Sequence, residues 1–275
     1  MGEITKPNKY KPMITKIITH DGIFHADDVM SIALMLEFIR PTLKVERTRN
    51  ISADEFTNPD IWIVDVGGQY DQVNNNYDHH QDNSLPAACM LVLIELVNLG
   101  KIDTVMHEEL FDAVYEISDI DCNGPADKNG FQVNTLIKSF NSIEDGFELA
   151  VDVCRKYIQS CKANAAKSEE SKKIWDAGEK MSNIRVCDAF PIHWKRYKEE
   201  NFLVYPQAGK WNVISADSEK FPLLDYNNAA VFIHVNRFIA VFNSKQEALE
   251  CAFDSGLAIL GKQKIEKINK IKSKF

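Results

Sequence analysis

The sequence predicts an α/β protein: a parallel sheet with helices on both faces, followed by a smaller α+β domain. Short strand-like apolar segments alternate with amphipathic helical segments in the first half of the chain. Histidines and aspartates lie where these strands end, and open parallel sheets bind ligands beyond the carboxyl ends of their strands. A chain of 275 residues with 45% hydrophobic content can bury two cores, and its length favours two domains.

The first domain is expected over residues 14–165. Apolar periodicity and turn residues predict strands at 16–19, 44–49 and 61–66 and helices at 26–40, 86–99 and 104–120. Pro41 stops the first helix. Gly67-Gly68 ends the third strand, since the backbone must turn sharply there. The run Asn74-Asn75-Asn76 predicts a further turn.

The second half of the chain differs in composition. Residues 144–181 are rich in Ala, Glu, Lys and Ser and lack Pro, which predicts one or two helices broken near Ser168, with 166–183 as a helical linker. A smaller α+β domain is expected over 184–262, with strand-like segments at 184–190, 202–205, 211–216 and 230–242.

Two local signals refine this second domain. Asn236-Arg237 is expected to turn the last strand-like segment into a hairpin, and Ser244 and Glu247 have the spacing of a capping box for the next helix. The basic tail, 263–275, predicts either an amphipathic terminal helix or a contact with a phosphate backbone or a partner.

Composition limits the function classes. The net charge of -8 argues against a general basic surface that coats nucleic acid, but it allows a cleft whose carboxylates bind cations. The six cysteines include no C-x-x-C pair, so a reducing compartment fits best. No secretory signal and no apolar run of roughly 18 to 20 residues is present. We expect a soluble protein without a membrane partner, in the cytosol first, with the nucleus or a mitochondrion as alternatives; its oligomeric state stays open.

The first candidate cluster is His20-x4-His25-x-Asp27, on a strand-to-helix loop and the first helical turn. Asp65 falls at the carboxyl end of another strand. Divalent ions of the manganese type accept mixed nitrogen and oxygen ligands, so these residues can form part of a metal site. Alternatively, Asp27 and Asp28 only stabilise the positive end of the helix dipole, and the histidines are incidental.

The second cluster is Asp78-His79-His80. Adjacent side chains on an extended segment point in different directions, so one histidine can bind metal while the other faces a substrate phosphate. Asp78 can then orient one of the rings. Together the two clusters contain four of the seven histidines. We therefore predict a site for two divalent ions, with a purely structural polar network as the alternative.

These segments resemble the DHH phosphoesterase superfamily, which includes RecJ-type exonucleases and manganese pyrophosphatases. The closer match is the branch named for melanocyte proliferating gene one, regarded as RNA exonucleases. The motifs that carry the resemblance are Thr19-His20-Asp21-Gly22-x-Phe24-His25-Ala26-Asp27, Arg47-Thr48-Arg49, Val64-Asp65-Val66-Gly67-Gly68-x-Tyr70-Asp71 and Tyr77-Asp78-His79-His80-Gln81.

The resemblance implies a division of ligands. His20, His25 and Asp65 would hold one ion, while Asp27, Asp65 and His79 would hold the other with a further aspartate near residue 120. The branch usually carries Asp-x-x-Asp-Asn-Gly there, but this chain places Asp119 in the first position and Cys122 in the second. Asp119 is therefore our first choice for the remaining ligand and Asp121 our second.

The resemblance also implies substrate contacts. His80, oriented by Asp78, would contact the attacked phosphate, and His234 of the second domain would touch nucleic acid or phosphate. Arg47 and Arg49 could reach another phosphate, or they could only decorate an exposed strand, since alternate residues of a strand share one face. His234 could likewise be an ordinary strand residue. The glycine-rich stretch usual after this histidine is replaced by Asn236-Arg237-Phe238-Ile239-Ala240-Val241.

The leading functional hypothesis is a manganese-dependent phosphodiesterase, with magnesium or another divalent ion as the alternative. It would act as an exonuclease on RNA or short oligonucleotides. Two ions can activate water and stabilise charge on the attacked phosphate. A second hypothesis is a small-molecule phosphatase acting on pyrophosphate, a cyclic dinucleotide or nanoRNA. A third is a homologue that binds metal without turnover.

Overall fold

The computed structural model describes residues 13–127, 130–197, 200–225 and 229–272, with side chains up to residue 261. The chain divides into two compact units: the first ends at Ala165, and the second begins at Ala166. The basic tail expected at 263–275 lies outside the described side chains. None of the helices in the described ranges combines the length and the apolar character needed to cross a bilayer.

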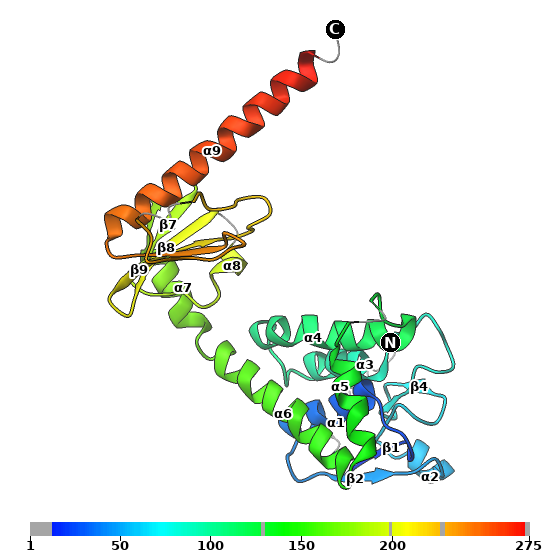
Figure 1. Ribbon diagram of the computed structural model, residues 1–275. Helices are drawn as coiled ribbons and strands as arrows, with labels where there is room; N and C mark the ends of the chain where they lie inside the picture. The colour runs from blue at the N-terminus through cyan, green and yellow to red at the C-terminus, as the bar shows by residue number, and fades with distance from the viewer. Residues whose placement is uncertain (1–12, 128–129, 198–199, 226–228, 273–275) are drawn as a thin grey trace, which may run out of the picture. The chain divides into compact units, whose positions relative to one another are not determined.

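The first unit contains a five-stranded sheet in the order β2-β1-β3-β5-β4 (Figure 1). β1, β2, β3 and β5 run parallel, and the short edge strand β4 runs antiparallel to β5. The strands span Lys16–Thr19 (β1), Lys44–Arg47 (β2), Ile61–Val64 (β3), Tyr70–Asp71 (β4) and Asn76–Tyr77 (β5). The predicted parallel sheet is therefore confirmed.

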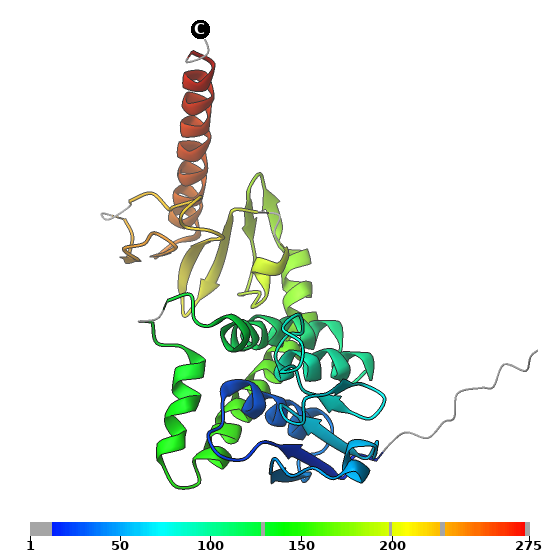
Figure 2. The same cartoon turned by 90° about the vertical axis from the view of Figure 1, so that its right-hand side faces the viewer.

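Helices cover the two faces of this sheet unequally (Figure 2). Ile17, Trp62 and Val64 pack into the large core with α1, α3, α4 and α6, whereas Ile18 and Ile63 on the other face pack against the short α2. The alternation of side chains along a strand produces this division. The helices are α1 Ala26–Phe38, α2 Ala53–Phe56, α3 Ala88–Asn98, α4 Thr104–Asn123, α5 Val133–Ser139, the 3-10 turn η1 Phe140–Ser142, and α6 Gly146–Ala165.

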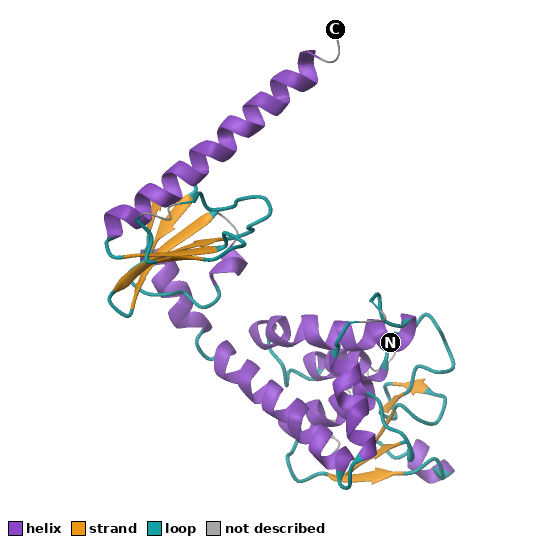
Figure 3. Cartoon of the chain, in the orientation of Figure 1, coloured by secondary structure: helices purple, strands orange, loops and turns teal. Residues whose placement is uncertain are grey.

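The second unit is an α+β domain with a six-stranded, largely antiparallel sheet in the order β10-β11-β9-β8-β7-β6 (Figure 3). β7 and β8 alone among these neighbours pair parallel. Its elements are α7 Ser168–Ala177, β6 Glu179–Met181, β7 Ile184–Val186, α8 Trp194–Tyr197, β8 Phe202–Gln207, β9 Lys210–Ser215, β10 Phe232–Ile233, β11 Ile239–Phe242 and α9 Lys245–Lys272.

The expected hairpin and capping box are both present in this unit. β10 and β11 pair antiparallel around the turn at Asn236-Arg237. The Ser244 hydroxyl accepts from the Glu247 backbone N–H, and Glu247 Oε2 accepts from the Ser244 N–H. These two bonds satisfy donors that a helix start leaves unpaired.

The strands expected at 44–49 and 61–66 end at Arg47 and Val64, and the helix expected at 26–40 ends at Phe38. Two further expectations differ from the structure for a clear physical reason. α4 continues three residues beyond Ile120 and ends at Gly124, whose φ of 76° suits glycine. The segment 166–183 is not a free linker, because Trp175 of α7 is buried in the second unit and β6 pairs with β7. The apolar stripe of α7 needs that cover, so it packs onto the sheet rather than bridging two domains.

Substitution of Gly67 tests whether the turn after β3 needs a glycine. It has a φ of 100°, and a Cβ at this position would lie 2.7 Å from Phe56 Cε1. Gly68 is also left-handed, with φ 67°, but a Cβ there meets nothing within 4 Å. We expect Gly67→Ala to lower the free energy of unfolding by about 2 kcal/mol or more, and Gly68→Ala by only about 1 kcal/mol. Urea unfolding of both variants measures this; equal losses would contradict the role of Phe56.

Glu37 of α1 forms ion pairs that connect this helix to α6. Its carboxylate binds Arg155 Nε and Lys162 Nζ, each at 2.9 Å. Burial raises the pKa of Glu37, but these partners outweigh it and hold the pKa below its ordinary value of 4.5. Because the folded pKa is depressed, the stabilisation is present above about pH 4.5 and is lost as the pH falls through the folded pKa.

We expect Glu37→Gln to lower the free energy of unfolding by about 1 kcal/mol near neutral pH, with the loss shrinking in acid. Urea unfolding at two pH values measures it. Glu148→Gln, at an exposed position of α6, is the control. A loss of equal size at both pH values would refute the assignment.

Candidate metal centre

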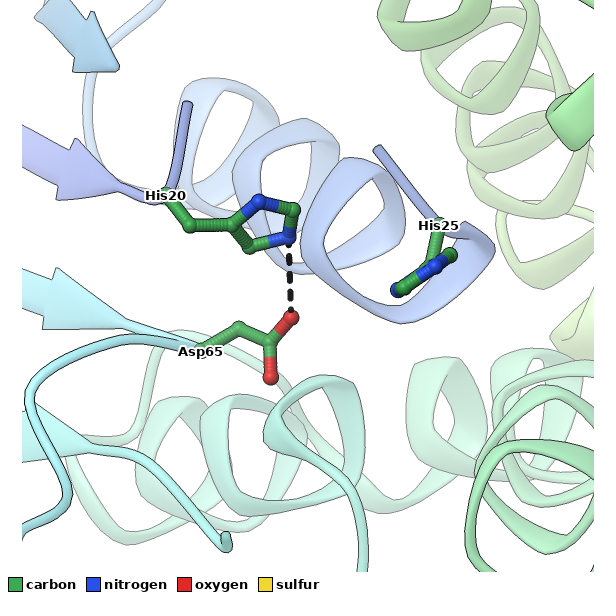
Figure 4. A group of neighbouring side chains, drawn as sticks. All are labelled: His20, His25 and Asp65. Carbon is green, nitrogen blue, oxygen red and sulfur yellow. Dashed lines mark ion pairs between the residues drawn. The ribbon is translucent and has the colours of Figure 1, made fainter. Parts of the chain in front are cut away.

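The functional side chains meet at one edge of the first sheet. His20 directly follows β1, Asp65 follows β3 and Asp78 follows β5. These three strands are parallel neighbours in the sheet. The carboxyl ends of parallel neighbours lie together, so the three loops converge there. Figure 4 shows His20 and Asp65 leaving adjacent strands and His25 at the start of α1.

Asp65 stands at the centre of this convergence. His20 Nε2 lies 3.4 Å from Asp65 Oδ2, and His79 Nε2 lies 3.5 Å from Asp65 Oδ1. Ligand atoms of His20, His25 and Asp65 lie within 4.8 Å of one another. The backbone of Asp65 has a φ of 55°. Such a left-handed, non-glycine conformation costs energy and is found at functional sites.

Aspartates surround the ring of His79. Its Nε2 lies 3.3 Å from Asp121 Oδ2 and 3.9 Å from Asp27 Oδ2, in addition to Asp65. Asp121 first, and Asp65 next, raise the pKa of His79 to about 11. Three candidate ligands, all carboxylates, therefore lie around one imidazole nitrogen.

His80 is oriented by its neighbour Asp78. Asp78 Oδ2 accepts from the Gly68 N–H at 2.6 Å, and Asp78 Oδ1 lies 2.6 Å from His80 Nδ1. Asp78 is buried, whereas the His80 side chain is 63% exposed. The backbone bond fixes the carboxylate, which in turn fixes a ring that faces solvent at the pocket.

Asp28 belongs to the cluster, although the sequence suggests only a helix-start role. Its Oδ1 accepts from the His25 N–H at 2.9 Å, as a capping residue would, while its Oδ2 lies 3.3 Å from His20 Nε2. Burial raises the pKa of Asp28 to about 7 and that of Asp27 well above its usual range. The Asp27-Asp28 pair was the available signal, but its burial could not be seen in the sequence.

The cluster has the character of a cation site. Both carboxylate oxygens of Asp27, one each of Asp28 and Asp65, and Nε2 of His79 are buried without a hydrogen-bond partner. Buried carboxylates of this kind are costly unless a charge of opposite sign compensates them. The donors are imidazole nitrogens and carboxylate oxygens, which suit a divalent transition ion. The residues present therefore fit the metal that the sequence predicts.

A cavity of about 510 Å³ opens onto the cluster. His25, His80 and Asp121 line it together with Cys122 and Asn123 of α4. Polar side chains thus face space large enough for a phosphate and its substituents.

α4 brings Asp121 and not Asp119 to the cluster. Asp119 is exposed and accepts a hydrogen bond from Asn123 Nδ2 at 2.8 Å. Cys122 Sγ lies 4.0 Å from His79 Nδ1. Among the six cysteines it is exposed, and the other five are buried. The thiol therefore stands where the motif of the resembled family has a carboxylate.

Arg47 and Arg49 contact the loop that carries His20 and His25. Arg47 Nη2 donates to the Gly22 carbonyl at 2.7 Å, and its guanidinium lies 4.3 Å from the Phe147 ring centroid. Arg49 Nε pairs with Asp21 Oδ1 at 3.2 Å, with both side chains exposed. These contacts hold the loop between His20 and His25 from outside the cavity.

His234 lies in the second unit, in the turn between β10 and β11. Its Nδ1 accepts from the Asn236 N–H at 3.1 Å, and its ring centroid is 4.4 Å from that of Phe238. The imidazole is thus held by the hairpin turn itself.

Comparison with known proteins finds a family model that matches the segment carrying most of the candidate ligands. Residues 16–89 match the MYG1 exonuclease family model, described as Uncharacterised protein family (UPF0160). A MYG1 protein of Chlamydia muridarum is 35% identical over 134 residues, covering 46% of this chain and 45% of the relative. The Homo sapiens MYG1 exonuclease is 39% identical over 66 residues, covering 24% of this chain and 17% of the relative. The matched part is less than half of these relatives' length.

Solved structures give weaker likenesses. A pGpG-specific phosphodiesterase, PggH, from Vibrio cholerae is 12% identical, with 94% of this chain and 99% of that chain covered and a TM-score of 0.33. The resemblance drawn from the sequence motifs is confirmed by the family match: residues 16–89 of this chain are similar to the MYG1 exonuclease family (UPF0160).

Proposed function

We propose that this chain is a metal-dependent phosphodiesterase, an exonuclease acting on RNA or short oligonucleotides. The observation that carries the proposal is Asp65, a buried carboxylate with an unpartnered oxygen placed between His20 and His79. The match of residues 16–89 to the MYG1 exonuclease family model supports the same class of reaction.

The residues divide into two ligand groups that share Asp65. His20 and His25 would complete one group, and Asp27, His79 and Asp121 the other. Two divalent cations held there, manganese first in our proposal, would supply Lewis-acid stabilisation of the phosphate and activation of water. Asp121 replaces Asp119 as the preferred ligand, because it faces His79 Nε2 at 3.3 Å.

The remaining residues position the substrate. His80 is an exposed imidazole at the cavity, so it can donate to a phosphate oxygen while Asp78 holds its orientation. Arg47 and Arg49 act mainly through the loop of His20 and His25, since both side chains already contact it or its flank. Contact between His234 and substrate stays a prediction.

The ligand groups can be separated from the substrate group by substitution. We expect Asp65→Asn to abolish binding of the paired ions, since this carboxylate is shared. His80→Ala should retain the ions and lower kcat by about 10² to 10³. Titration calorimetry with Mn²⁺ and elemental analysis measure binding. Asp54→Asn, at an exposed position of α2, is the control, and equal metal loss in the Asp65 and His80 variants would refute the division of roles.

A substrate panel tests the reaction itself. Metal-loaded protein should release mononucleotides from labelled RNA, and a chelator should stop the release because the carboxylates alone cannot stabilise the attacked phosphate. Pyrophosphate and a cyclic dinucleotide are tested at the same enzyme concentration. Faster turnover of either would indicate a small-molecule phosphatase, and metal binding without any turnover would indicate a non-catalytic homologue.

A further inference from the structure

An aromatic ladder runs along α4 toward the metal cluster. His107, Phe111 and Tyr115 are four residues apart and therefore share one helix face. The ring centroids of His107 and Phe111 are 5.4 Å apart, and those of Phe111 and Tyr115 are 5.8 Å apart with planes at 19°. Phe111 is 39% exposed and Tyr115 54% exposed. Large aromatic rings left open to solvent on one helix face are typical of binding surfaces.

These rings form one wall of a second cavity, of about 440 Å³, which we call the side slot. Pro86, just before α3, and Met90, in its first turn, line it together with Phe111 and Tyr115. The slot therefore has apolar side chains from two different elements and aromatic rings among them. Flat, apolar groups suit such a space better than charged ones do.

The side slot is continuous with the metal cavity. Asn83, Leu85, Cys122 and Asn123 line both cavities. A molecule whose phosphate lies beside His79 and His80 can therefore extend its next substituent into the slot. In a nucleotide that substituent is the sugar with its base.

We propose that the side slot binds the nucleobase next to the phosphate held at the metal cluster, by stacking against Tyr115 and Phe111. The inference rests on the proposed function and assigns the base recognition of the same site. Aromatic stacking is sequence-tolerant, since every base has a π-face. The slot would therefore favour nucleotide substrates over phosphoesters that carry no base.

Charge decides which part of the nucleotide enters the slot. Asp119 lines it. This carboxylate repels a second phosphate, whereas a neutral base meets no such penalty. The slot therefore accepts a base, and it disfavours the continuing backbone of a long strand. Short oligonucleotides fit this charge pattern better than long ones.

Tyr115 provides the test, with Tyr115→Phe as the matched control that retains the ring. We expect Tyr115→Ala to raise KM for an RNA dinucleotide about 10-fold and to leave kcat within about twofold, because stacking contributes to binding rather than to the reacting atoms. The wild type should prefer the intact dinucleotide to one with an abasic position. This preference should collapse in Tyr115→Ala and persist in Tyr115→Phe.

A binding measurement separates this inference from the proposed reaction. Fluorescence anisotropy of a labelled dinucleotide with a non-hydrolysable linkage, measured on the metal-loaded protein, requires no turnover, and Tyr115→Ala should weaken binding about 10-fold relative to Tyr115→Phe. That loss supports the slot even if no substrate is hydrolysed. Equal affinity of the two variants, or equal effects on intact and abasic dinucleotides, overturns it. A change in sedimentation of Tyr115→Ala would also overturn it, by showing that the face joins copies of the chain.

Discussion

The burial of Asp65 is the constraint on which the first unit depends. The carboxylate is 3% exposed, and one of its oxygens has no hydrogen-bond partner. Burial raises its pKa, but the nearby rings of His20 and His79, at 3.4 and 3.5 Å from its oxygens, hold the pKa down to about 2, so the group stays charged. A buried charge needs compensation from fixed partners, and those partners come from separate loops. The position of Asp65 thus determines where His20 and His79 must lie.

Each loop around Asp65 is held by contacts outside the cluster. Asn141 donates to the Phe24 carbonyl at 2.9 Å and accepts from the Phe24 N–H at 3.0 Å, which secures the segment between His20 and His25. Arg47 holds the same segment through Gly22. For the cations that we propose, this support would lower the reorganisation that the ligands undergo on binding.

The first unit combines two kinds of surface along α4. Near its carboxyl end the helix presents Asp121 and Cys122 to the metal cavity, and farther back it presents Tyr115 and Phe111 to the side slot. In our proposal, the spacing of residues on one helix links the binding of the phosphate to the binding of the base. The second unit has its own sheet and core.

The sequence by itself determined the parallel sheet, the helix periods and the sites where ligands collect. Strand and helix periods are local, and parallel neighbours bring His20, Asp65 and His79 to one edge whatever the details of packing. Only the tertiary structure could choose between Asp119 and Asp121. Residues two positions apart on a helix, such as Asp119 and Asp121, point in directions that differ by about 200°. Packing alone sets the rotation of α4 about its axis, and so decides which of them faces the cluster. Three other features were decided in the same way: the burial of Asp28, the hydrogen bond from Arg47 to a distant loop, and the packing of α7 against the second sheet. Each depends on contacts between segments far apart in the chain.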